Sequence, residues 1–110
     1  MRKEYRIRKN EEFGALMGEH HSSASSSFVV YRRNRQEAKA RFGISVSKKL
    51  GGAVERNLIK RQLRMMITET VDFAQYPFDC VVIVRKGYLK QSYAGNKKDL
   101  EKLLKTGRIG

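Results

Sequence analysis

The stretch 48–64 contains the side chains with the most definite chemistry in this sequence. It carries six Lys or Arg residues and one carboxylate, that of Glu55, so its positive charges cannot all be paired locally. At about 100° per helical residue, four polar positions share one arc: Asn57, Lys60, Arg61 and Arg64. The neighbouring arc holds the positions that we expect to face a core: Ile59, Leu63, Met66, Ile67 and Thr70. Cations gathered on one side of a helix are typical of a phosphate-binding surface, and a solvated basic face is the alternative.

Leu58 fits neither arc of this predicted helix. It lies about 200° from Arg56 around the helix axis, away from the cationic positions and from the core-facing stripe. We therefore expect its side chain to be substantially exposed, or to cover only the edge of a sheet.

The composition of the whole chain supports a polyanionic partner. The 110 residues include 24 Lys and Arg against 11 Asp and Glu, which gives a net charge of +13 and a pI near 10.2. A compact protein with this imbalance repels itself and is stabilised beside a polyanion, most often nucleic acid and next an anionic membrane surface. The hydrophobic fraction of 40% is enough for one domain with a modest core, so a disordered basic tail is excluded.

A second surface is predicted from the alternation in residues 41–47. Phe42, Ile44 and Val46 point to one face, and the small residues Gly43, Ser45 and Ser47 point to the other, where a chain could lie flat on the strand. Two neighbouring segments supply side chains for the same open face: Val29, Tyr31 and Arg33 from the preceding strand, and Phe13 and Met17 from the first helix. Aromatic side chains in a basic groove hold single-stranded nucleic acid. The alternative is that Phe13, Leu16 and Met17 are only the core stripe of a short helix.

No enzyme signature is evident in the sequence. Cys80 is the only cysteine and sits in an apolar run, so we predict a buried, inert thiol and no disulfide. His20 and His21 are adjacent in a Ser-rich stretch, and the carboxylates are scattered, so we predict neither a metal site nor a catalytic acid/base pair in the chain. The N-terminus is charged from Arg2 onward, without a signal peptide or membrane span, so a cytoplasmic protein with no membrane partner is expected.

The remaining pattern predicts a single domain over 1–110 with a basic N-terminal segment, 1–9. The first half should contain a helix N-capped by Asn10 and ending near Gly18, a loop at 20–27, a strand at 28–33, a polar turn at 34–38 and a strand at 41–47. A Gly51-Gly52 break with a short extended piece should then lead into the basic helix, which runs to about residue 71. We expect the chain to continue with a strand at 79–85 buried on both faces and a helix capped near Asn96, with Leu100, Leu103 and Leu104 inward. The order αββ(β)αβα indicates an α+β protein with helices packed on a sheet.

Two segments of the chain carry a resemblance to a known family. They read Ile44-Ser45-Val46-Ser47-Lys48-Lys49-Leu50-Gly51 and Ala53-Val54-x-Arg56-Asn57-x-Ile59-Lys60-Arg61-x-x-Arg64. This pattern resembles the signature of the bacterial ribonuclease P protein subunit. Residues 2–13, 28–31 and 84–86 also match that family's pattern in order, so the resemblance covers nearly the whole chain. Three positions depart from the usual pattern: Met17, Gly52 and Leu58.

The resemblance implies a fold and a function. The fold is a four-stranded sheet with a left-handed βαβ crossover, where the right-handed form is the general rule. The function is to bind a catalytic RNA and the single-stranded 5′ leader of precursor tRNA. That RNA uses bound Mg²⁺ to cut the leader from the tRNA and leaves a 5′-phosphate. No protein partner is implied.

The resemblance also assigns the site residues to two surfaces. The leader cleft is implied to be lined by Phe13, Met17, Val29, Tyr31, Gly43, Ser45 and Ser47. The contacts to the catalytic RNA are implied to come from Lys48, Lys49, Arg56, Asn57, Lys60, Arg61 and Arg64. A structural RNA-binding protein, such as a ribosomal protein, and a protein-only ribonuclease with its own acid/base pair remain the alternatives.

Overall fold

The computed structural model describes residues 1–18 and 21–106 of the chain. Its helices are α1 (Asn10–Met17), α2 (Ala53–Thr70) and α3 (Tyr93–Thr106), and its strands are β1 (Ser22–Ala24), β2 (Phe28–Asn34), β3 (Phe42–Ser45) and β4 (Phe78–Val84). Short 3₁₀ helices lie at Lys3–Tyr5, Lys48–Leu50 and Lys86–Lys90. His20 lies outside the described residues.

The four strands form one mixed sheet in the order β1-β2-β4-β3. The pairs β1/β2 and β2/β4 are antiparallel, whereas β3 and β4 are parallel and are connected through α2. The α+β class and the four-stranded sheet are therefore confirmed. The left hand of the β3-α2-β4 crossover stays a prediction.

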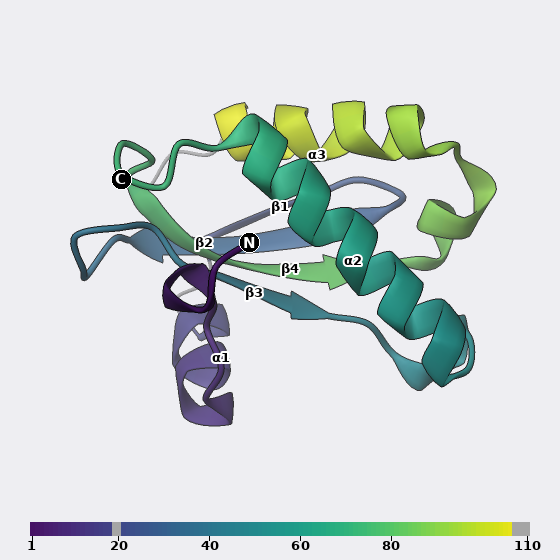
Figure 1. The fold of residues 1–110 in the computed structure, drawn as a ribbon, viewed down its shortest axis with the longest axis horizontal. Helices are drawn as coiled ribbons and strands as arrows, with labels where there is room; N and C mark the ends of the chain where they lie inside the picture. Colours follow the sequence, from purple (N-terminus) through teal and green to yellow (C-terminus); the bar gives the residue numbers. More distant parts are fainter. Residues whose placement is uncertain (19–20, 107–110) are drawn as a thin grey trace.

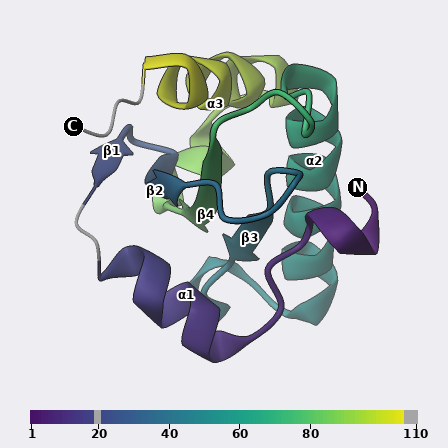
Figure 2. The ribbon, with the colours of Figure 1, turned by 90° about the vertical axis from the view of Figure 1, so that its left-hand side faces the viewer.

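The helices cover the two faces of the sheet unequally. In Figures 1 and 2, α2 and α3 lie on one face, and only the short helix α1 lies on the other. The main core fills the space between the sheet and α2 and α3. It includes the predicted α2 stripe and the predicted inward leucines of α3: Ile59, Leu63, Met66, Ile67, Leu100, Leu103 and Leu104. Thr70, the last residue of the predicted stripe, is only partly buried.

A smaller cluster lies under α1 on the opposite face of the sheet. Its buried members are Ile7, Leu16 and Val81, and partly buried side chains pack around them: Phe13, Met17, Tyr31 and Ile83. Because α1 has only eight residues, it covers only part of this face. The rest of the face is the surface from which a cleft can be built.

Four local predictions were wrong. Asn10 is the first residue of α1, and Lys9 stands at the N-cap without a side-chain hydrogen bond. Residues 22–24, predicted as loop, form the edge strand β1, whereas α2 follows Gly52 directly without a strand between them. Asn96 lies buried within α3, where it donates to the Tyr88 carbonyl (3.0 Å) and accepts from the Ser27 hydroxyl (2.9 Å).

In the part of the chain that the structure describes, no helix has the length and apolar character needed to cross a membrane.

Candidate RNA interfaces

The floor of the open sheet face is set by strand register. Val29 of β2 and Ser45 of β3 both pair with Ile83 of β4, so the three side chains form one row across the sheet. Tyr31 and Gly43 pair with Val81 in the row beside it. Because side chains alternate along a strand, both rows point to the face that carries α1. The predicted common face of β2 and β3 is confirmed.

The first helix can approach this floor because residue 43 has no side chain. A Cβ atom built on Gly43 would lie 2.5 Å from Cζ of Phe13, closer than any real side-chain contact. Leu16 is fully buried against Val81, whereas Phe13 and Met17 are only half-buried. Leu16 is therefore the core anchor of this helix. Phe13 and Met17 pack at the edge of the same cluster and keep part of their surface exposed, so their role as a wall of the cleft stays a prediction.

An ion-pair network fixes α1 on the sheet. Glu12 of α1 lies 2.8 Å from the Arg41 guanidinium and 4.0 Å from that of Arg33. Both arginines also pair with Asp79, whose fully buried carboxylate accepts a 3.0 Å hydrogen bond from the backbone N–H of Arg41. A buried carboxylate is stable only with partners of this kind. The network was missed from the sequence because its members come from segments far apart in the chain.

Six of the seven predicted cleft residues thus lie on the sheet face that carries α1, whereas Ser47 lies beyond the end of β3, where it caps a 3₁₀ helix. Val29 and Tyr31 are half-buried on the floor, Gly43 lies under Phe13, and Ser45 and Ser47 are exposed. Ile83 belongs to the same floor and was not predicted. The alternation Asp79, Val81, Ile83 along β4 is the signal that could have identified it.

The predicted contacts to a catalytic RNA share the outer side of α2 and the turn before it. Lys48, Lys49, Asn57 and Arg61 are exposed, and Arg56, Lys60 and Arg64 are partly exposed. Among the described residues, no carboxylate forms an ion pair with any of these cations. The charges are therefore available to an external anion.

Local sequence sets the start of this cationic helix. The Ser47 hydroxyl accepts a 3.2 Å hydrogen bond from the backbone N–H of Lys49 and caps the 3₁₀ helix that holds both lysines. Gly51 then adopts φ = 148°, a conformation that favours glycine. A Cβ there would also lie 2.9 Å from Cβ of Glu55. The predicted Gly51-Gly52 break is confirmed, and it directs α2 across the sheet.

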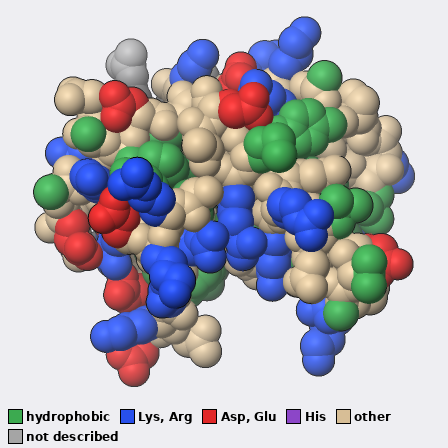
Figure 3. Space-filling view, in the orientation of Figure 1, with side chains coloured by type: hydrophobic (Ala, Val, Ile, Leu, Met, Phe, Trp, Pro, Cys, Tyr) green, Lys and Arg blue, Asp and Glu red, His purple; other side chains and the backbone are tan. Residues whose placement is uncertain are grey.

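The N-terminal segment completes a cationic cleft beside α2. Arg6 and Arg8 line it together with Lys60 and Arg64, around a volume of about 260 Å³. Burial lowers the pKa of the Arg64 guanidinium, and the positive charge of Arg6 lowers it further. Phe13 lines the same cleft, so the cationic surface and the open sheet face meet at this ring. Figure 3 shows Lys and Arg side chains gathered near the middle of the face that α2 crosses.

Apolar side chains interrupt the outer side of α2. Leu58 is 48% exposed, and Val54 and Met65 are also exposed. The predicted exposure of Leu58 is confirmed, and with it the helical phase used in the sequence analysis.

The structure also describes the surroundings of the lone cysteine and of the residue types that commonly bind metal ions. Cys80 is buried, as predicted, and burial raises the pKa of its thiol to about 12. Within residues 1–18 and 21–106, no group of three or more His, Cys, Asp or Glu side chains could hold a metal ion.

Comparison with known proteins gives one consistent family. A family model described as Ribonuclease P matches residues 1–107. The chain is 45% identical over 101 residues to the ribonuclease P protein component of Bacillus cereus strain G9842, covering 91% of this chain and 88% of that protein. It is 41% identical over 109 residues to the component from Streptococcus pneumoniae serotype 4, covering 99% and 89%.

A solved structure resembles the fold as well. It is that of a Staphylococcus aureus RNase P protein mutant described as defective in mRNA degradation activity. The TM-score is 0.82 at 40% sequence identity, and the match covers 94% of this chain and 87% of that one.

Proposed function

The chain belongs to the ribonuclease P protein family, and on that premise we propose that it binds both the catalytic RNA of ribonuclease P and the single-stranded 5′ leader of precursor tRNA. The relatives' name identifies a protein component of the tRNA 5′-processing endoribonuclease. The proposed part is that one surface of this chain binds the catalytic RNA and the other binds the leader.

One observation carries the proposal: the chain has two chemically different surfaces that meet at Phe13. The outer side of α2 presents cations without a described carboxylate partner, which suits the phosphates of a folded RNA. The open sheet face presents small residues beside Phe13, Met17 and Tyr31, which suits the bases of an unpaired strand. A basic structural protein needs only the first surface.

The contacts proposed for each partner follow from these surfaces. Lys48, Lys49, Arg56, Asn57, Lys60, Arg61 and Arg64 face the catalytic RNA. Val29 and Ser45 form the floor under the leader, Phe13, Met17 and Tyr31 stack against its bases, and Gly43 leaves room for the Phe13 ring. Ser47 lies at the end of the floor.

The chemistry of leader removal is proposed to belong to the RNA subunit. Mg²⁺ held by that RNA would supply the activated water and neutralise the leaving oxygen. The protein side chains would bind and orient the substrate, and among the described residues no group of three or more His, Cys, Asp or Glu side chains could hold a metal ion. We place this ribonucleoprotein in the cytoplasm, with no membrane or further protein partner.

Cleavage assays with three additions test this function. Precursor tRNA is incubated with the purified chain alone, with the chain plus a ribonuclease P RNA, and with the chain plus a ribosomal RNA fragment. We expect release of the leader only with ribonuclease P RNA, at a higher rate than with that RNA alone at low Mg²⁺. Cleavage by the chain alone would favour a protein-only ribonuclease, and tight binding to the ribosomal fragment without stimulation would favour a structural protein.

A further inference from the structure

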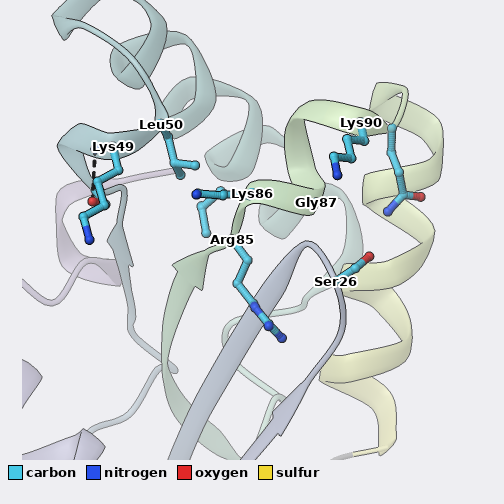
Figure 4. A pocket seen from close by; sticks show the side chains of 10 residues that line it. Ser26, Lys49, Leu50, Arg85, Lys86, Gly87 and Lys90 are labelled. Atoms are coloured by element: carbon cyan, nitrogen blue, oxygen red, sulfur yellow. Dashed lines mark hydrogen bonds between the residues drawn. The ribbon is translucent and has the colours of Figure 1, made fainter.

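The two ends of β4 lie among charged side chains of different kinds. Beyond its last residue, at the end shown in Figure 4, Lys49, Arg85 and Lys86 line a groove to which no described carboxylate contributes. At its first residues the cations are Arg33 and Arg41, and both form ion pairs with carboxylates. Cations that are neutralised in this way attract an external polyanion only weakly, so the charges at the start of β4 have another role.

Strand register builds the charged row at the start of β4. Arg33 of β2 pairs with Asp79 of β4. Arg41 lies on the other side of Asp79, because the residue after it, Phe42, pairs with Cys80. The row is two residues along each strand from the floor of the proposed leader cleft, so its side chains point to the same face of the sheet.

Glu12 connects α1 to this row. Its carboxylate lies 2.8 Å from the Arg41 guanidinium. Glu12 Oε2, Arg41 Nε and Asp79 Oδ2 are buried and have no hydrogen bond within the described part of the chain. Opposite charge rather than directed hydrogen bonding therefore holds Glu12 in place, and the position of this end of α1 depends on the balance of charges beneath it.

The apolar attachment of α1 lies about one helical turn further along. Leu16 is fully buried and packs with Val81. Phe13 follows Glu12 directly and thus lies between the two points at which the helix is attached to the sheet. Without the ion pair at Glu12, α1 could turn about Leu16 and carry the Phe13 ring away from Gly43.

We infer that Glu12 is a positioning residue for the substrate. Through its ion pair with Arg41 it holds the Phe13 ring over the sheet, and so acts on the leader without touching it. This inference rests on the proposed function. It gives an acidic residue a part in binding a polyanion, which the net charge of the chain alone would not suggest.

Glu12→Gln tests the inference, with Glu11→Gln as the matched control. Both substitutions remove one negative charge from the first turn of α1, but Glu11 is exposed and forms no ion pair with another described residue. The full chain is assembled with ribonuclease P RNA, and kcat and KM for precursor tRNA are measured together with affinity for mature tRNA. We expect Glu12→Gln to raise KM by about three- to tenfold, up to the loss of one weakly stacked base, and to leave kcat and mature tRNA unaffected. Glu11→Gln should change none of the three.

A double-mutant cycle with Phe13→Ala shows whether Glu12 acts through the ring. In the Phe13→Ala chain, Glu12→Gln should raise KM no further, because the ring that Glu12 positions is absent. Glu12→Asp keeps the negative charge and should restore most of the loss. Denaturant unfolding of each variant establishes that it is folded under the assay conditions.

A fluorescent reporter measures the position of α1 without any RNA. The sequence contains no tryptophan, so Met17→Trp places a single indole on the same helix. In this background Glu12→Gln should shift the emission to longer wavelength and increase quenching by acrylamide, whereas Glu11→Gln should do neither.

Several outcomes would overturn the inference while leaving the proposed function intact. They are additive effects of Glu12→Gln and Phe13→Ala on KM, equal effects of Glu12→Gln and Glu11→Gln, and an unchanged KM for Glu12→Gln where Phe13→Ala raises it. A Glu12→Gln chain that does not fold would make Glu12 a residue of general stability, which also contradicts the inference. If Phe13→Ala itself left precursor tRNA unaffected, the proposed leader cleft would fail, and the inference with it.

Discussion

The ring of Phe13 occupies the space that a side chain at Gly43 would need. A Cβ atom at residue 43 would lie 2.5 Å from Cζ and 2.7 Å from Cε1 of that ring. The aromatic wall of the cleft thus depends on the absence of a side chain on the opposite strand, and the substitution of a single glycine tests the cleft.

Gly43→Ala should push the Phe13 ring away from the sheet and weaken binding of the leader. We expect affinity for precursor tRNA to fall by about tenfold, the lower part of the range for one lost stacking contact of about 1–3 kcal/mol. Affinity for mature tRNA should be unchanged. Equilibrium binding of both tRNAs to the assembled enzyme measures the effect, and Gly14→Ala is the control, because a Cβ at Gly14 meets no atom within 4 Å. Equal losses for the two tRNAs would contradict the proposed leader cleft.

Tyr31→Ala and Lys60→Ala should separate the two surfaces. Tyr31 lies on the sheet floor, so its loss should weaken binding of precursor tRNA and leave assembly with the RNA subunit close to normal. Lys60 lies on α2 in the cationic cleft, so its loss, like that of Arg56, should weaken assembly itself. The measurements are assembly titrations and tRNA binding for each variant. If the variants lost both properties in the same proportion, a single diffuse basic surface would be the better description.

The salt dependence of assembly should report the cations of α2. With several phosphate contacts, affinity for the RNA subunit should fall steeply with salt, with a log–log slope of several units. Arg61→Ala and Arg64→Ala should each reduce that slope by about one unit. A slope near zero for the unaltered chain would rule out an electrostatic interface.

Leu58→Arg should change folding stability little, whereas Leu63→Ala should change it greatly. Leu58 is 48% exposed, so the substitution should cost under about 0.5 kcal/mol. Leu63 is fully buried between α2 and the sheet, and its truncation should cost about 2–5 kcal/mol. Denaturant unfolding of both variants gives the comparison. The added arginine also extends the cationic side of α2, so tighter assembly with RNA is expected.

The Cys80 thiol should resist labelling in the folded protein and make stability decrease at high pH. Burial raises its pKa to about 12, whereas an unfolded thiol ionises near about 8.5. Between these two pKa values the thiol ionises only in the unfolded chain, which stabilises the unfolded state. The contribution of the buried Cys80 thiol to stability is therefore complete below about pH 8.5 and is lost as the pH rises toward the pKa in the folded protein. Unfolding measured from pH 8 to 11, with Cys80→Ala as the control, should show the extra decrease only in the unaltered chain. Rapid labelling of Cys80 in the native protein at pH 8 would contradict the expected resistance of this thiol.

Periodicity was sufficient to predict which side faces the core in the elements with long, regular patterns. The stripe from Ile59 to Ile67 and the alternation from Phe42 to Val46 each fixed which side of an element faces the core, because burial selects one face of a helix or strand. The phase of α2 was accurate enough to place Leu58 outside both faces. The same alternation predicted the common face of β2 and β3, which their register with β4 confirms.

The predictions that failed concern features that depend on partners distant in sequence. β1 has only three residues, Ser22–Ala24, and lacks an apolar alternation, so its pairing with β2 gives no local signal. Asn96 has the side chain of a helix cap, but it serves a buried contact with Ser27, 69 residues away. The pairing of Asp79 with Arg33 is likewise a product of strand register. No pattern within one segment contains such information.

The position of β4 in the sheet has a consequence for the time at which the protein acquires its shape. β2 and β3 are both made before β4, yet they do not pair with each other, because β4 lies between them. A nascent chain ending before residue 78 can form the β1–β2 hairpin and helical segments. Among the described residues, its only pairing for β3 is the bridge between Arg6 and Phe42. α1 also lacks its support, since Leu16 packs on Val81. Synthesis of about three quarters of the chain therefore precedes the complete four-stranded sheet, and the two surfaces proposed to bind RNA form together in one late, cooperative step.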